Sequence, residues 1–210
     1  MLSAIAALAA VLGAAVLAFV LVRVRTYVPS PTYAPAGEPC REVAVAYYSF
    51  WGHSEAVARE IARTFNAPIA RIDADYPHNW GGLRRAGDDA RSRVLPDIRV
   101  EPIDLMPVRR LFLVGPTWWY RPATPLWACV ERTDLTGREV VLVTTANRRF
   151  RQAETAAFAA RVEARGGRLV AHIFLARGFI FWQQSRAELL AETRTRLAAL
   201  RSARDGPDRR

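Results

Sequence analysis

Hydroxyl, glycine and imidazole groups follow the first predicted strand of the chain at a spacing that suits an anion. Glu42–Tyr48 has the apolar, β-branched and aromatic composition of a buried strand. Ser49-Phe50-Trp51-Gly52-His53-Ser54 comes next, and a helical pattern begins behind it with Ser54 placed as the N-cap. Free N–H groups and the positive end of a helix dipole attract phosphate, and glycine allows close approach of the backbone. The loop predicts an anion site, although such corners also carry serine and glycine for capping alone.

Three consecutive aromatic residues follow another predicted strand, Leu111–Gly115. The segment reads Pro116-Thr117-Trp118-Trp119-Tyr120. Three adjacent rings cannot all point into one core, so we expect at least one to face outward at the end of the strand. An outward ring there offers a stacking surface for a flat heteroaromatic ligand. The alternative is an exposed aromatic patch that contacts a protein or a membrane.

The elements that must position these loops alternate between strand and helix. Such alternation predicts an α/β domain with an open parallel sheet and helices on both faces. In these sheets ligands bind beyond the carboxyl ends of the strands, so the loops after the first, third and fourth strands should meet. The predicted strands are Glu42–Tyr48, Pro68–Ile72, Leu111–Gly115, Glu139–Thr145 and Leu169–Leu175. The predicted helices are Glu55–Phe65, Thr124–Glu131, Ala153–Ala164 and Ser185–Leu200.

The order of these segments resembles the flavodoxin-like family over about Glu42–Gly178. It is most similar to the FMN-binding reductases in which a Gly-x-Pro-x-Trp-Trp segment lines the flavin. The resemblance implies a doubly wound five-stranded parallel sheet of order 2-1-3-4-5 and FMN as the cofactor. It implies that the phosphate is held by Ser49, Trp51, Gly52, His53 and Ser54. It implies that the ring contacts Pro116, Thr117, Trp118, Trp119 and Tyr120, with Thr144, Thr145 and Asn147 at its edge.

The chain departs from the family pattern at two places. Trp51 stands where the phosphate loop of the family has a hydroxyl residue, and Ala146-Asn147 stands where a Gly-Gly pair is common. These departures keep open a flavin-free protein that uses the fold and the Trp-rich loop for protein contact.

The resemblance implies a redox function, for which we expect electrons or hydride from NAD(P)H to reach a quinone or another lipophilic acceptor. A one-electron carrier for a membrane partner is the alternative. Arg148 and Arg149 are candidates to stabilise reduced flavin or hold a nicotinamide phosphate, or are solvated loop charges. The stretch Asp75–Arg93 is a candidate lid, with substrate contacts from Tyr76, Trp80 and Asp88.

The remaining reactive residue types leave the catalytic residues unknown and predict no metal site. The three histidines are far apart in the sequence, and Cys129 lies within an apolar helical pattern. Any redox chemistry would therefore come from the cofactor rather than from a side-chain nucleophile.

The N-terminal residues predict a membrane anchor. Leu2–Val22 is uncharged and lacks proline, and at ~1.5 Å per residue a helix of this length would cross a hydrocarbon core of roughly 30 Å. No basic residue precedes the run, which argues against a cleaved signal peptide. Arg23 and Arg25 follow it directly, so we expect a single-pass protein of the cell membrane whose domain faces the cytoplasm.

The charge of the chain limits its partners. The net charge is +10, and all 30 Lys+Arg positions are arginine, spread along the sequence. A nucleic-acid reader more usually mixes both residues and clusters them, so we expect a membrane face or an acidic partner instead. The expected organisation is an anchor over 1–25, a Pro-rich tether over 26–40, a domain over 41–203 and a disordered tail over 204–210.

Overall fold

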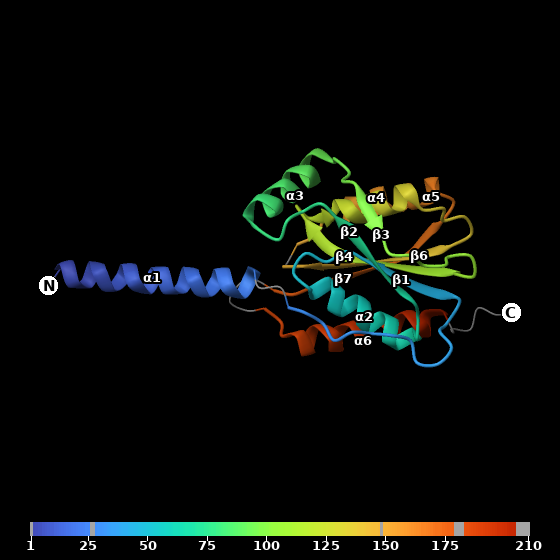
Figure 1. Ribbon diagram of the computed structural model, residues 1–210, viewed down its shortest axis with the longest axis horizontal. Helices are drawn as coiled ribbons and strands as arrows, with labels where there is room; N and C mark the ends of the chain where they lie inside the picture. The colour runs from blue at the N-terminus through green and yellow to red at the C-terminus, as the bar shows by residue number, and fades with distance from the viewer. Residues whose placement is uncertain (1, 26–27, 148, 179–182, 205–210) are drawn as a thin grey trace.

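The computed structural model describes residues 2–25, 28–147, 149–178 and 183–204 (Figure 1). The elements are α1 (Leu2–Arg25), β1 (Val43–Tyr47), α2 (His53–Phe65), β2 (Ile69–Ala74), α3 (Trp80–Ser92), β3 (Ile98–Val100), β4 (Arg110–Trp118), β5 (Arg121–Pro122), α4 (Thr124–Arg132), β6 (Glu139–Ala146), α5 (Gln152–Ala164), β7 (Arg168–Ala176) and α6 (Arg186–Arg204).

One sheet organises the described domain, in the order β3-β2-β1-β4-β6-β7. The pairs from β2 through β7 are parallel, and they are the five strands that the sequence predicts, in the predicted order 2-1-3-4-5. That prediction is confirmed. Two short antiparallel strands were not predicted: β3 pairs with β2, and β5 pairs with β4. Segments of three and two residues are too short to show a hydrophobic period.

Helices cover both faces of the sheet, with α2 and α6 on one side and α3, α4 and α5 on the other (Figure 1). The residues of β1 alternate between the two cores. Val43, Val45 and Tyr47 pack with α2 and α6, whereas Ala44 and Ala46 pack with the opposite layer. Because both faces are buried, the central strands are continuous apolar runs rather than alternating ones.

Helix α3 occupies most of Asp75–Arg93, the stretch that the sequence indicates as a candidate lid without predicting a helix in it. Its N-cap is Asn79, whose side-chain Oδ1 accepts a hydrogen bond from the N–H of Gly82 at 3.0 Å. The glycine is needed because a Cβ at Gly82 would lie 1.9 Å from the carbonyl oxygen of Pro77. The Gly81-Gly82 pair therefore begins a helix instead of interrupting one.

Helix α2 begins earlier than the sequence predicts. Its N-cap is Gly52, with φ 84° and ψ −6°, so Ser54 is a residue of the first turn and the expectation that Ser54 is the N-cap is wrong. The left-handed backbone of Gly52 turns the chain before Ser54 can do so.

The N-terminal helix α1 extends away from the domain (Figure 1). The apolar side chains described for it, such as Ile5, Leu8 and Val11, are exposed. Within the described residues, none of the helices has the length and hydropathy that crossing a membrane requires. The helix is therefore confirmed, whereas its prediction as a transmembrane span is not supported.

Residues 28–40, which the sequence predicts as a tether, lie against the domain. The Tyr33 hydroxyl donates to the carbonyl of Ala62 at 3.0 Å, and the Arg186 guanidinium donates to the carbonyl of Pro29 at 2.8 Å. The side-chain amide of Asn66 donates to the carbonyl of Ala36 at 2.9 Å. The chain that leaves α1 is thus held along α2 and α6. Of the predicted tail 204–210, all but Arg204 lies outside the described residues.

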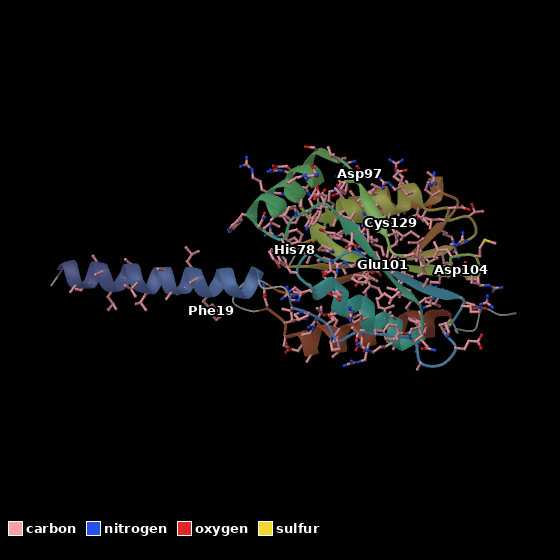
Figure 2. All side chains as sticks on the ribbon, viewed as in Figure 1. Phe19, His78, Asp97, Glu101, Asp104 and Cys129 are labelled. Atoms are coloured by element: carbon pink, nitrogen blue, oxygen red, sulfur yellow. The ribbon has the colours of Figure 1, made fainter. Side chains whose placement is uncertain are left out.

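Cys129 lies inside the domain on α4 (Figure 2). It is buried, and this burial raises the pKa of its thiol, while a hydrogen bond with Thr133 lowers it to a smaller extent. A thiol with a raised pKa is a core group and a poor nucleophile at neutral pH.

Candidate functional site

A cavity of about 390 Å³ lies at the carboxyl ends of β1, β4 and β6, where the three predicted loops meet. We call it the sheet-edge pocket. The predicted residues that line it are Ser49, Trp51, His53, Ser54, Pro116, Thr117, Trp118, Trp119, Tyr120, Thr145, Asn147 and Arg149. The fold therefore brings together side chains that are up to 100 positions apart in the sequence, as expected at a switch in strand order.

The first loop is held by its own side chains. The N–H of Gly52 donates to Ser49 Oγ at 3.0 Å, which closes the turn between β1 and α2. The N–H of Val28 donates to the carbonyl of Trp51 at 3.2 Å, and a Cβ at Gly52 would lie 2.2 Å from the carbonyl oxygen of Val28. Glycine is thus required at this position by the approach of the chain's own backbone.

The charged side chains that line the sheet-edge pocket at the first loop are positive, and Glu55 in the first turn of α2 is paired with Arg59. Burial lowers the pKa of His53 to about 4, and the nearby guanidinium groups of Arg177 and Arg186 lower it further. Arg149 and Arg177 line the sheet-edge pocket, whereas neither Asp nor Glu is among the described residues that line it. Together with the N-terminus of α2, these arginines create a potential that favours an anion.

The third loop contributes one threonine to the pocket and turns the other away. Ser54 Oγ and Thr145 Oγ1 are 2.8 Å apart, so the first turn of α2 is hydrogen-bonded to the end of β6. Thr144 Oγ1 instead hydrogen-bonds His172 Nε2 at 2.8 Å, and Thr144 does not line the pocket. Neighbours on a strand point to opposite faces, which explains why only one of the two threonines reaches the site.

The aromatic loop is a two-residue hairpin turn between β4 and β5. Thr117 pairs with Pro122 and Trp118 with Arg121, which leaves Trp119 and Tyr120 at the turn with φ 51° and 65°. Left-handed backbone at both positions is the geometry of a type I′ turn, where Asn-Gly is usual. Bulky residues in this conformation are uncommon and mark a site that is constrained by its surroundings.

The three rings of this loop point in different directions. Trp118 is buried and packs edge-on against Tyr48 and Tyr76, with ring centroids 5.4 and 5.3 Å away. Trp119 and Tyr120 are 49% and 39% exposed, which confirms that the consecutive rings do not all enter the core. Two rings therefore lie outside the core at the end of β4, and each has a guanidinium over it, Arg91 over Trp119 and Arg151 over Tyr120.

The predicted substrate-contacting residues separate in the structure. Tyr76 is buried, and its hydroxyl donates to Asp89 Oδ2 at 2.7 Å, so it belongs to the core rather than to the pocket lining. Trp80 is 62% exposed and, with Asp88, lines a neighbouring cavity. Arg148 lies outside the described residues.

Sequence reasoning missed several residues of the sheet-edge pocket. Arg177 and Gln183 follow β7, and Leu83 comes from α3. Inspecting the loop after every predicted strand would have found Arg177, since it comes directly after β7. Leu83 carries no comparable signal, because the helix that positions it is not apparent in the sequence.

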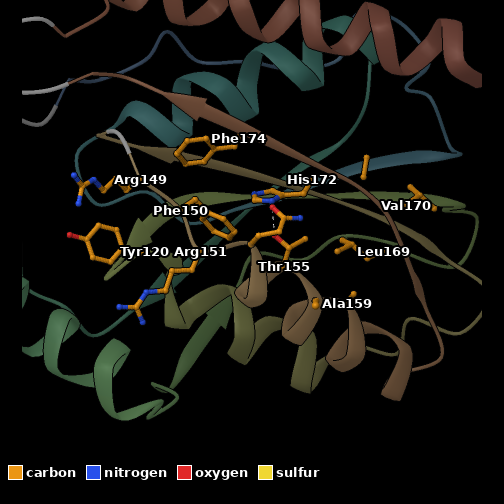
Figure 3. Close-up of a pocket in the computed structure, with 13 residues that line it drawn as sticks. Tyr120, Arg149, Phe150, Arg151, Thr155, Ala159, Leu169, Val170, His172 and Phe174 are labelled. Carbon is orange, nitrogen blue, oxygen red and sulfur yellow. Dashed lines mark hydrogen bonds between the residues drawn. The ribbon is translucent and has the colours of Figure 1, made fainter.

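A larger groove of about 1050 Å³ lies between α5 and β7 (Figure 3). His172 lines this groove and is hydrogen-bonded through both ring nitrogens, with Thr144 at 2.8 Å and Thr155 at 2.9 Å. Burial lowers the pKa of His172 to about 4, so its imidazole is neutral at physiological pH. A neutral ring with both nitrogens bonded positions α5 on the sheet and is not a free acid or base.

No group of three or more His, Cys, Asp or Glu residues is placed to hold a metal ion within the described parts of the chain. The polar groups of the sheet-edge pocket include hydroxyls, two amides, an imidazole and guanidinium groups. This donor set suits an anionic organic ligand rather than a cation.

Comparisons with known proteins identify the fold. No family model matches the chain, and no curated protein matches it. Among solved structures, a flavoprotein in complex with FMN from Lactobacillus acidophilus NCFM is 17% identical, with 64% of this chain and 93% of that chain covered and a TM-score of 0.55. The apo-form of the flavoprotein from the same organism is 16% identical over 73% of this chain and 99% of that chain, with a TM-score of 0.51.

A third structure supports the same assignment. A protein from Bacteroides uniformis ATCC 8492, described as a proposed flavoprotein, is 17% identical over 73% of this chain and 97% of that chain, with a TM-score of 0.54. At these identities the likeness establishes architecture alone. Together with the strand order β2-β1-β4-β6-β7, it shows that this chain has a flavodoxin-like fold.

Proposed function

We propose that the chain binds FMN in the sheet-edge pocket and acts as a flavin-dependent redox protein. One observation carries the proposal: a single pocket joins two outward aromatic rings to a helix N-terminus and two arginines, with no carboxylate among its described lining. FMN has the matching chemistry, because a flat heteroaromatic ring is attached through a ribityl chain to a phosphate. The fold neighbour from Lactobacillus acidophilus was solved in complex with FMN, which supports the same ligand.

In this proposal each group of side chains has a separate role. The N–H groups at the start of α2 and the Arg177 guanidinium bind the phosphate. Trp119 and Tyr120 stack on the ring, and Thr117 and Asn147 offer hydrogen bonds at its edge. His53 is neutral above about pH 4, so it contributes hydrogen bonding rather than charge. Bound FMN would supply the hydride and electron chemistry.

We propose NAD(P)H as the electron donor and a lipophilic molecule such as a quinone as the acceptor. Arg149 on the pocket lining is suited to a nicotinamide phosphate, since guanidinium pairs with phosphate in a bidentate manner. A one-electron carrier is the alternative within the redox class. Oxidation of NAD(P)H by the FMN-loaded chain would distinguish the two, because a carrier would not catalyse it at a useful rate.

The second candidate function is that of a flavin-free interaction protein. It is favoured because the hydroxyls of the first loop already have hydrogen-bond partners within the chain. Ser49 Oγ already accepts from Gly52, and Ser54 Oγ is already bonded to Thr145. A phosphate would therefore depend on backbone N–H groups and arginine. Failure of the chain to take up FMN would favour this candidate.

Membrane association through α1 is also part of the proposal, with the domain on the cytoplasmic side. The exposed apolar side chains of α1 support it, since such a surface is costly in water. Fractionation of cells that express the full chain tests it: association should survive alkaline carbonate and be lost on Leu8→Glu with Leu12→Glu. Recovery of the unsubstituted chain in the soluble fraction would contradict membrane association.

The FMN proposal is tested by titrating the full chain with FMN and with riboflavin, which lacks the phosphate. We expect FMN to bind with its fluorescence quenched. Trp119→Ala should weaken both ligands about tenfold, equivalent to ~1.4 kcal/mol. Arg177→Ala should weaken FMN but not riboflavin, and Arg168→Ala on the far end of β7 should change neither. A full chain that binds neither ligand would contradict the proposal that this is a flavoprotein.

A further inference from the structure

A second cavity lies on the α3 side of Trp119. It has a volume of about 550 Å³ and is formed between α3 and the end of β4. We call it the α3 cavity. Its apolar lining includes Trp80, Leu83, Trp118 and Trp119. Two of these rings, Trp80 and Trp119, are 62% and 49% exposed, so the cavity presents an aromatic surface to solvent.

Trp119 lies at the boundary between the α3 cavity and the sheet-edge pocket, and it lines both together with Leu83, Thr117 and Trp118. Its position is set by α3 as well as by the hairpin turn. The guanidinium carbon of Arg91 lies 4.5 Å from the centroid of the Trp119 ring. On the helix surface, Gly87 leaves room for the indole: a Cβ there would lie 2.9 Å from Trp119 Nε1. The ring is therefore a fixed wall rather than a loosely held surface side chain.

The two cavities differ in charge. In the α3 cavity the charged lining residues are Arg84, Asp88 and Arg91, and both arginines pair with Asp88, with Arg84 Nε 3.8 Å from its Oδ2. In the sheet-edge pocket Arg149 and Arg177 occur without a carboxylate among the described lining residues. The lining of the α3 cavity thus carries one net positive charge, because two arginines share one carboxylate, whereas the described lining of the sheet-edge pocket carries two, so an anionic ligand is drawn more strongly to the sheet-edge pocket.

The start of α3 places Trp80 at the mouth of the α3 cavity. The Asn79 side chain caps the helix through the N–H of Gly82, which fixes the backbone on which Trp80 stands. A tryptophan this exposed at the first residue of a capped helix contributes little to the core. Covering its exposed surface together with the exposed part of Trp119 would remove apolar area from water.

We propose that the α3 cavity binds an uncharged, planar, apolar ring compound between Trp80 and Trp119. The planar shape follows from the exposed indole surfaces of Trp80 and Trp119, and the preference for an uncharged compound follows from the apolar lining of the cavity. The assignment of this cavity to the lipophilic acceptor rests on the proposed function, whereas binding of a ring compound in it does not require FMN.

The experiment uses the full chain and two probes with the same ring system. Calorimetric titration with 2-methyl-1,4-naphthoquinone should show binding, and 1,4-naphthoquinone-2-sulfonate, which carries a charge, should bind at least fivefold more weakly. Trp80→Ala should weaken the uncharged probe at least fivefold, and Trp80→Phe should restore most of it. Met106→Ala, at an exposed residue before β4, should have no effect.

FMN affinity is measured on the same variants to separate the two proposals. Trp80→Ala should leave FMN binding within twofold, because Trp80 does not line the sheet-edge pocket. Equal binding of the uncharged probe to the unsubstituted chain and to Trp80→Ala would overturn the α3 site. So would displacement of the probe by FMN at a one-to-one ratio, or tighter binding of the sulfonate. Probe binding that depends on Trp80 in a chain that takes up no FMN would uphold the α3 site and reject the proposed function.

Discussion

The hydroxyl groups of Ser54 and Thr145 lie 2.8 Å apart and join the start of α2 to the end of β6. Both side chains are buried, so neither hydroxyl can replace its partner with bulk water. This contact connects the loop proposed for the phosphate to the loop proposed for the ring edge. The geometry of the sheet-edge pocket thus depends in part on a hydrogen bond between distant parts of the sequence.

Replacement of Thr145 by valine tests that dependence. Thr145→Val keeps the shape of the side chain and leaves the Ser54 hydroxyl without its partner, so we expect a loss of about 1–3 kcal/mol in the free energy of unfolding. Urea denaturation measures it. The double variant Ser54→Ala with Thr145→Val should lose less than the sum of the two single changes, because no buried hydroxyl is then orphaned. Additive losses would contradict coupling.

We expect Trp119 and Tyr120 to make the hairpin turn less stable than the residues that a type I′ turn favours would make it. Trp119→Asn together with Tyr120→Gly supplies the residues that a type I′ turn favours and removes left-handed backbone from two bulky residues. We expect a gain of about 1 kcal/mol in the free energy of unfolding. Binding of FMN should fall at least tenfold in the same variant. A loss of stability, or unchanged FMN binding, would show that the turn does not hold these rings for a ligand.

Protonation of histidine is expected to destabilise the domain at mildly acidic pH. Burial lowers the pKa of His172, and burial with Arg177 and Arg186 lowers that of His53, each from 6.5 to about 4. The unfolded chain therefore binds more protons than the folded chain between these values. The stabilising contribution is complete above pH 6.5 and is lost as the pH falls toward 4.

Urea midpoints measured from pH 7.5 to 4 test this pH dependence. His172→Gln should reduce the slope of stability against pH within the window from 6.5 to 4, while leaving part of it to His53. Proton NMR of the folded chain should show the His172 ring titrating near 4. A His172 ring that titrates near 6.5 would contradict the buried neutral imidazole.

A buried ion pair should matter more than an exposed one on the same carboxylate. Arg121 Nε lies 3.3 Å from Glu154 Oε2 with both side chains buried, and the Arg121 guanidinium also donates to the carbonyl of Ala90 at 2.9 Å. Glu154→Gln leaves the buried guanidinium without a countercharge, so we expect a cost of about 3–5 kcal/mol. Arg93→Gln removes the exposed partner of Glu154 and should cost under about 1 kcal/mol. Thermal or urea unfolding of the two variants gives the comparison, and equal costs would argue against burial as the reason.

The sheet could be predicted because the composition of each strand by itself indicates a buried strand. Strands that are buried on both faces must be apolar throughout, so runs such as Val140–Val143 are visible without knowledge of their neighbours. Helix α3 was not visible, because Gly81 and Gly82 argue against a helix unless the Asn79 cap and the contact with Pro77 are known. The short strands β3 and β5 depend on pairing partners and have no local signature.

The candidate site likewise has features that the sequence predicts and features that it does not. The sequence alone determined that Ser49–Ser54 and Pro116–Tyr120 follow strands, and a strand order of 2-1-3-4-5 is enough to bring their ends together. It also determined that three adjacent aromatic residues could not all be buried. These conclusions rest on chain connectivity and hydrophobic period, which are local properties.

Only the tertiary structure decided which side chains face the pocket. Thr145 reaches it while Thr144 turns to His172, and Trp80 rather than Tyr76 faces a cavity beside Trp119. Residues of similar type that lie close together in the sequence cannot be told apart by composition. The direction in which each side chain points depends on strand pleat, on helix phase and on contacts with distant residues such as Arg91 and Gly87. Residue type thus predicted the chemistry of the site, and packing alone oriented it.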